Sequence, residues 1–106
     1  MVKLIALYRH PEDQQAFDDH YENVHAPLAQ KMPGLQRLEV TKIAGTPMGE
    51  QAPYYLEAAM YFESEEALKQ AMGSPEGRAA AKDLMGFAGP LVTMMIGEVT
   101  ATGERV

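Results

Sequence analysis

Three histidines are the residues of this 106-residue chain best suited to proton transfer: His10, His20 and His25. An unperturbed imidazole has a pKa of about 6.5, so it gains or loses a proton near neutral pH. His20 and His25 fall on one predicted helix, where roughly 100° per residue separates them by about 140° around the axis. Helical metal pairs need spacings of three or four residues, so we predict no metal site.

His25 is the strongest catalytic candidate. It lies one helical turn beyond Tyr21 and just before Pro27, where an expected kink would open space above a sheet. His25 would then act as a general acid or base, or donate to a substrate oxygen, with the Tyr21 hydroxyl as its partner. The structural alternative is a helix-end histidine that bonds the last carbonyls and is favoured by the helix dipole.

Candidate substrate contacts lie on the same helix and on two predicted strands. Tyr55 and Tyr61 alternate with acidic residues, so they could line a semi-polar cavity, and packing in a dimer interface is the alternative. Methionines such as Met60 make adaptable apolar walls, although they more often fill a core. The predicted substrate contacts are His20, Tyr8, Phe17, Tyr61 and Met60. His20 has an alternative role as a boundary residue, and His10, beside Pro11, is explained as a turn or capping residue.

Several kinds of site are missing from the sequence. No glycine-rich stretch has the spacing of a phosphate cradle after a strand. Ser64 and Ser74 are both explained as helix caps, which leaves no nucleophilic triad. The absence of cysteine removes thiol nucleophiles, thiolate zinc sites and disulfides, and makes the cytoplasm the expected location. We predict no cofactor.

Composition narrows the partners further. Hydrophobic residues make up 46% and charged residues 23%, which are ordinary values for one globular domain over residues 1–106. A formal net charge of -6 lacks the basic surface that nucleic acids and anionic membranes require. The apolar start of the chain is too short for a signal peptide, and no span of membrane length follows. The predicted partner is a small apolar or semi-polar molecule, with no nucleic acid and no membrane.

The elements that must position these residues follow from hydrophobic periodicity. Alternating apolar residues predict strands, apolar residues three and four apart predict helices, and glycine and proline separate them. The predicted order is strand 2–9, helix 12–25 with a further turn beyond a kink at Pro27, strand 35–44, loop 45–53, strand 54–63, a helix from Ser64 restarted at Pro75, strand 91–100 and a tail 101–106. This βαββαβ order predicts an α+β, ferredoxin-like fold, with a four-stranded antiparallel sheet and helices on one face. The loop is the predicted mobile lid.

The first and last strands are apolar on both faces. In the first strand, Leu4, Ala6 and Tyr8 point to one side, and Ile5 and Leu7 point to the other. Helices on one face cannot cover both, and a monomer would expose a large apolar patch. We therefore predict a symmetric homodimer that pairs sheet against sheet.

Several short patterns occur in a fixed order along the chain: Phe17, Tyr21, His25-Ala26-Pro27-Leu28, Met32-Pro33-Gly34-Leu35, Tyr61-Phe62 and Ser64-Glu65-Glu66-Ala67-Leu68. Together they resemble the EthD family of the dimeric α+β barrel superfamily. The resemblance implies a ferredoxin-like protomer that dimerises by facing sheets, in a setting of small-molecule catabolism linked to oxidoreductases. It also implies that His25 is the family's signature histidine, with Phe17, Pro27, Pro33 and Gly34 as structural companions.

The functional prediction combines His25 with this resemblance. The protein is expected to be an oxidoreductase-associated or cofactor-free enzyme, an oxidoreductase or isomerase, with His25 as proton shuttle. Its substrate would be a small, largely apolar carbonyl, lactone or phenolic compound. One alternative is a non-catalytic module that binds or carries such a compound for an oxygenase. Another is a haem-binding barrel with His25 or His20 as axial ligand.

Overall fold

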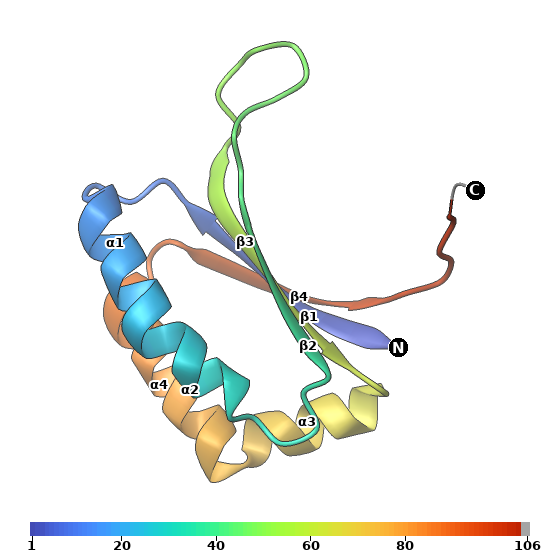
Figure 1. Cartoon of the computed structure of the whole chain (residues 1–106). Helices are drawn as coiled ribbons and strands as arrows, with labels where there is room; N and C mark the ends of the chain where they lie inside the picture. The colour runs from blue at the N-terminus through green and yellow to red at the C-terminus, as the bar shows by residue number, and fades with distance from the viewer. Residues whose placement is uncertain (105–106) are drawn as a thin grey trace.

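The computed structural model describes residues 1–104 as a four-stranded antiparallel sheet with helices on one face (Figure 1). The strand order across the sheet is β2-β3-β1-β4, so the first and third strands are central. The strands are β1 (Val2–Arg9), β2 (Arg37–Lys42), β3 (Tyr54–Phe62) and β4 (Val92–Glu98), and the helical segments are α1 (Gln14–His20), η1 (Tyr21–His25), α2 (Ala26–Gln30), α3 (Glu65–Gly73) and α4 (Pro75–Ala88). The predicted α+β, ferredoxin-like fold class is confirmed.

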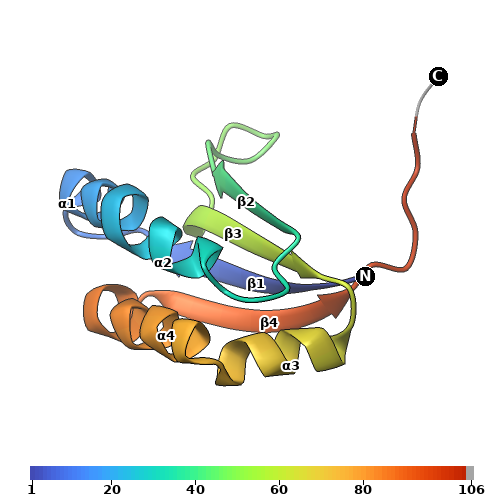
Figure 2. The same cartoon turned by 60° about the horizontal axis from the view of Figure 1, so that its bottom comes forward.

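Strand register decides which side chains face the helices. Residues paired across antiparallel strands share a face, and β1 pairs Ala6 with Met94 of β4 and Ile5 with Met95. Ala6 is buried beneath the helices, so Met94 lies on the helix face and Met95 on the opposite, open face. Figure 2 shows every helix on the same side of the sheet.

The first helical segment, where a kink or break was expected at Pro27, runs from Gln14 to Gln30 without interruption. Its N-cap is Asp13, whose carboxylate accepts a hydrogen bond from the Ala16 amide at 3.0 Å. In η1, a short π-helix, the Ala26 amide donates to the Tyr21 carbonyl five residues earlier. Pro27 then occupies the first turn of α2, where its missing N–H is tolerated. A widened turn, instead of a break, accommodates the proline.

The second helical segment divides at Ser74, as predicted. The Ser64 hydroxyl caps α3 by accepting from the Ala67 amide at 3.1 Å, and the Ser74 hydroxyl caps α4 by accepting from the Gly77 amide at 3.0 Å. A Cβ added at Gly77 would collide with the Ala71 carbonyl. Glycine is therefore required where α4 turns closely past the end of α3.

The core fills the space between the helices and the sheet. One half is aromatic, with Tyr8, Phe17 and Tyr21 packed against Leu84 and Ala88. The other half is mainly aliphatic, with one buried aromatic ring, and is built around Leu4, Met60, Phe62 and Leu68. Among the helices of the described residues, none is long and apolar enough to cross a membrane.

The open face of the sheet is partly apolar. Ile5, Leu7, Ala59 and Met95 share it, and 45% of the Met95 surface is exposed in the isolated chain. The loop between β2 and β3 extends beyond the end of the sheet, as Figure 1 shows. Its role as a lid stays a prediction.

Candidate functional site

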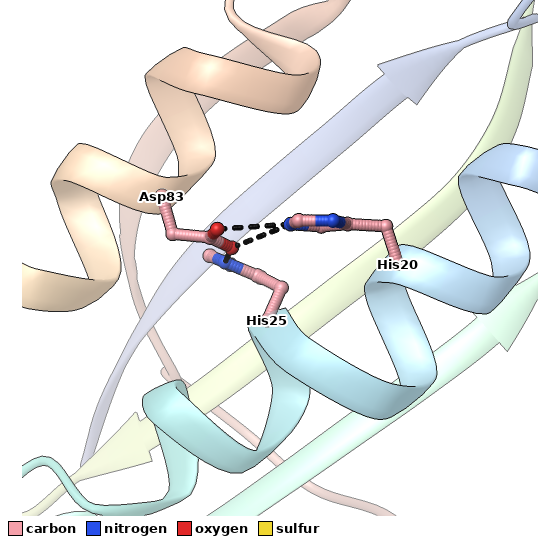
Figure 3. Close-up of polar contacts among 3 residues, drawn as sticks. All are labelled: His20, His25 and Asp83. Carbon is pink, nitrogen blue, oxygen red and sulfur yellow. Dashed lines mark hydrogen bonds and ion pairs between the residues drawn. The ribbon is translucent and has the colours of Figure 1, made fainter.

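One aspartate joins two of the three histidines. Asp83 of α4 accepts hydrogen bonds from His20 Nε2 at 2.9 and 3.1 Å and from His25 Nδ1 at 3.0 Å. In Figure 3 both imidazoles reach from the first helical segment toward this carboxylate on the neighbouring helix. Asp83 thus lies between an outer and an inner histidine.

The π-helical turn explains why the histidines converge. At ordinary α-helical spacing they would point about 140° apart. Hydrogen bonds five residues apart in η1 widen this turn and reduce the angle between the two side chains, so both rings reach Asp83. Single π turns are frequent at functional sites. The sequence prediction that His20 and His25 face apart was wrong because it assumed a regular α-helix. Asp83 was missed, since it lies 58 residues from His25 and belongs to no recognisable motif.

The environment of His25 fixes its protonation. Its surface is only 5% exposed, and this burial lowers its pKa from the ordinary value of 6.5. The hydrogen bond and charge of Asp83 partly oppose this shift, and a charge on His20 adds to it. Because a carboxylate only accepts hydrogen bonds, neutral His25 carries its proton on Nδ1. Nε2 is left with a free lone pair.

A small apolar cavity of about 80 Å³ lies beside His25, between the helices and the sheet. Among the described residues that line it, His25 alone has nitrogen or oxygen in its side chain. The lining residues are Leu4, His25, Ala29, Met32, Met60, Met72, Gly77, Ala80, Ala81, Leu84 and Met94. Met60, a predicted substrate contact, is therefore at the cavity, and Nε2 is the one polar ring atom left for a ligand there.

Aromatic rings pack against both histidines. The Tyr21 ring lies 5.5 Å from the His25 ring, and Phe87 lies 4.4 Å from the His20 ring. Tyr8 packs edge-on against Phe17 at 5.3 Å and against Tyr21 at 5.8 Å. Burial raises the pKa of Tyr21 to about 12, and the pKa of Tyr8 lies further above its usual range, because of burial and then the nearby Tyr21 and Asp83 charges. Both hydroxyls keep their protons at neutral pH.

Tyr61 does not join this group. It lies on the open face, where its hydroxyl donates to Glu39 at 3.5 Å and Lys3 lies 5.5 Å from its ring centre. Tyr55 is turned to the helix side by an irregularity in the pairing of β1 and β3, and its hydroxyl donates to Asp18. The structure therefore brings together His20, His25, Tyr8, Phe17, Tyr21 and Met60, but it places Tyr61 across the sheet.

His20 and His10 have different surroundings. The His20 side chain is 34% exposed and borders an outer groove together with Lys82 and Phe87. His10 makes a different contact, because its Nε2 lies 2.7 Å from the Ala52 carbonyl at the end of the loop before β3. Within residues 1–104, no cluster of three or more acidic or histidine side chains is arranged to hold a metal.

We expect acidification to destabilise the protein through His25. The folded state binds this proton less readily than the unfolded state, because burial lowers the folded pKa. Stability should therefore be full above pH 6.5 and should fall as the pH drops toward the folded pKa, by at most about 1.4 kcal/mol per pH unit. Melting curves recorded between pH 8 and 5 should show that stability depends less steeply on pH in His25→Gln than in wild type. Equal slopes would contradict this prediction.

A family model and a solved structure indicate the same family. The family model described as EthD domain matches residues 9–90. An uncharacterised 11.0 kDa protein of Rhodococcus erythropolis, from the thcB-thcC intergenic region, is 40% identical over 95 residues, covering 90% of this chain and 91% of the relative. The crystal structure of an ethyl tert-butyl ether D (EthD) family protein of Bacillus halodurans C-125 is 58% identical, with a TM-score of 0.91, covering 94% of this chain and 99% of that one.

More distant structures share the fold. A hydroxynitrile lyase of Passiflora edulis is 15% identical with a TM-score of 0.76, covering 97% of this chain and 96% of that one. A protein of Thermobifida fusca YX, described as dimeric and ferredoxin-like, is 15% identical with a TM-score of 0.68, covering 92% of this chain and 90% of that one.

Proposed function

The chain belongs to the EthD domain family, and we propose that it is an enzyme of small-molecule catabolism in which His25 transfers a proton to or from a small, largely apolar substrate. The observation that carries the proposal is the placement of His25 between Asp83 and an apolar cavity. A buried imidazole held by a carboxylate and open to a cavity on its other side is the usual arrangement of a general base.

Asp83 gives His25 its catalytic orientation. It fixes the ring and holds the proton on Nδ1, so that Nε2 points its lone pair to the substrate. When Nε2 accepts a proton, the imidazolium that forms is stabilised by the Asp83 charge. The lowered pKa keeps the resting ring neutral at pH 7, which is the state a base requires. The protonated ring then returns the proton to the product or to solvent.

Replacing Asp83 should separate its effects on the two histidines. Asp83→Ala leaves the His25 Nδ1–H unpaired in a buried position, which should cost about 1–3 kcal/mol of stability and remove the tautomer preference. In Asp83→Asn the amide oxygen can still accept from buried His25, whereas the NH2 group that replaces the other carboxylate oxygen cannot accept from His20. We therefore expect His25 to keep its tautomer while the tautomer of the partly exposed His20 changes. Long-range proton–nitrogen NMR correlations of the histidine rings, with melting curves, would show both results. An unchanged His25 tautomer in Asp83→Ala would contradict the role given to Asp83.

Haem binding is not supported by this site. The cavity beside His25 measures about 80 Å³, whereas pockets for ligands of drug or cofactor size measure roughly 300–1,000 Å³. His20 Nε2 is already bonded to Asp83.

We also propose that the protein is a homodimer formed by two open sheet faces. The apolar side chains of Ile5, Leu7 and Met95 on that face support the proposal. The Thermobifida fusca, Bacteroides fragilis and Jannaschia proteins of similar fold are each described as dimeric.

The test of the enzymatic proposal is conversion of a defined panel of compounds. Wild-type protein would be incubated with small neutral carbonyl, lactone, phenolic and aliphatic hydroxyl compounds, and each would be followed by proton NMR. We expect conversion of at least one compound, at a rate that depends on His25. Binding of a compound without conversion would favour the carrier alternative.

A further inference from the structure

The geometry points to a short, neutral hydroxyl compound as the ligand of the cavity beside His25, bound by donating its O–H hydrogen bond to Nε2. This inference rests on the proposed function, because it concerns the same site. It replaces the carbonyl, lactone or phenolic compounds expected from the sequence with aliphatic hydroxyl compounds.

The tautomer of His25 favours a ligand that donates a hydrogen bond. Asp83 accepts from Nδ1, so neutral His25 offers only a lone pair at Nε2. No other side-chain nitrogen or oxygen lines the cavity in the described part of the chain. A hydroxyl group pairs with Nε2, whereas a carbonyl, ether or ester oxygen finds no donor and leaves both polar atoms unpaired.

The charge of Asp83 and the apolar side chains that line the cavity favour a neutral ligand. The His25 ring separates the Asp83 carboxylate from the cavity. The other lining residues are methionines, leucines and alanines with one glycine. A carboxylate or phosphate entering this cavity would lose its hydration and meet a like charge, which is unfavourable on both counts.

Size selects a short ligand. An apolar cavity of about 150 Å³ binds benzene, and the cavity here is close to half that volume at about 80 Å³. It therefore suits roughly three to five non-hydrogen atoms, fewer than a phenol contains. The flexible methionine side chains, including Met60 and Met94, fit their shape around such a molecule.

The test compares propan-2-ol with acetone, which have the same heavy-atom skeleton but differ in hydrogen bonding. Both would be titrated into protein with carbon-13-labelled methionine methyl groups. Met60 and Met94 report on the cavity, and Met48, 84% exposed in the loop before β3, reports non-specific solvent effects. We expect propan-2-ol to shift the Met60 and Met94 signals at about tenfold lower concentration than acetone, since one net hydrogen bond separates them.

Two further measurements tie the preference to Nε2. His25→Leu removes the acceptor, so the preference for the alcohol should disappear. In wild type, acidification below the His25 pKa turns Nε2 into a donor, and acetone should then bind as well as propan-2-ol or better. Asp83, His20, Tyr8 and Tyr21 surround or adjoin this ring, so the His25 nitrogen signals would be followed in the same titration to identify the group that titrates.

Three results would overturn the inference: equal or tighter binding of acetone at neutral pH, no shift of the cavity methyls with either compound, or a preference that persists in His25→Leu. The proposed function fails in a different way. If propan-2-ol is preferred but no hydroxyl compound is converted, the inferred ligand class is supported and the enzymatic proposal is contradicted.

Discussion

Met95→Glu is expected to convert the proposed homodimer to a monomer while the protomer stays folded. Met95 lies on the open sheet face beside Ile5, where a facing sheet would bury it. Two-fold symmetry would place two unpaired carboxylates in one interface, and each buried charge costs several kcal/mol. We expect the dissociation constant to rise by about 10³-fold or more, which corresponds to about 4 kcal/mol. Light scattering at micromolar concentration measures the mass, and circular dichroism reports folding.

Met85→Glu is the matched control. Met85 lies on α4, on the helical side of the molecule, and is 65% exposed. A glutamate there remains in water, so the mass should equal that of wild type. A dimeric Met95→Glu protein would exclude the facing-sheet arrangement, and dissociation by Met85→Glu would place the interface on the helices.

The sequence predicted the fold well because hydrophobic periodicity is a local signal. The apolar, β-prone run from Val2 to Arg9 before Pro11 gave the bounds of β1, and the Ser64 and Ser74 caps gave the starts of α3 and α4. Strand β2 was predicted too long at both ends, as residues 35–44, whereas the structure has Arg37–Lys42. The apolar residues that flank it resemble strand residues.

The site was less predictable because it depends on tertiary contacts. His25 was already a candidate from the sequence, but Asp83 contacts it from another helix, and nothing in the sequence near Asp83 indicates that contact. The π turn before Pro27 was also missed, and with it the alignment of His20 and His25. Tyr61 was grouped with the site by residue type, and strand alternation places it on the other face from Met60.

His25→Gln is expected to lower turnover by about 10²–10⁴-fold, the usual contribution of a positioned acid or base. Glutamine can still donate a hydrogen bond to Asp83 and fills much of the same space, but it cannot accept and return a proton. Alanine would be a poorer test, because it would leave a cavity and an unpaired Asp83 in a position where His25 is 5% exposed. We therefore expect the stability of His25→Gln to stay within about 1 kcal/mol of wild type at pH 7.5.

The rate would be measured by proton NMR on a compound that wild-type protein converts, together with a melting curve for each variant. His10→Gln provides the matched control, because it makes the same substitution at a histidine that contacts the Ala52 carbonyl and lies away from the cavity. Its turnover should equal that of wild type. Full activity in His25→Gln would show that His25 does not transfer the proton. If the fraction of His25→Gln that is unfolded at the assay temperature accounts for the whole loss of rate, His25 is instead a structural residue that keeps Asp83 paired within the helical layer.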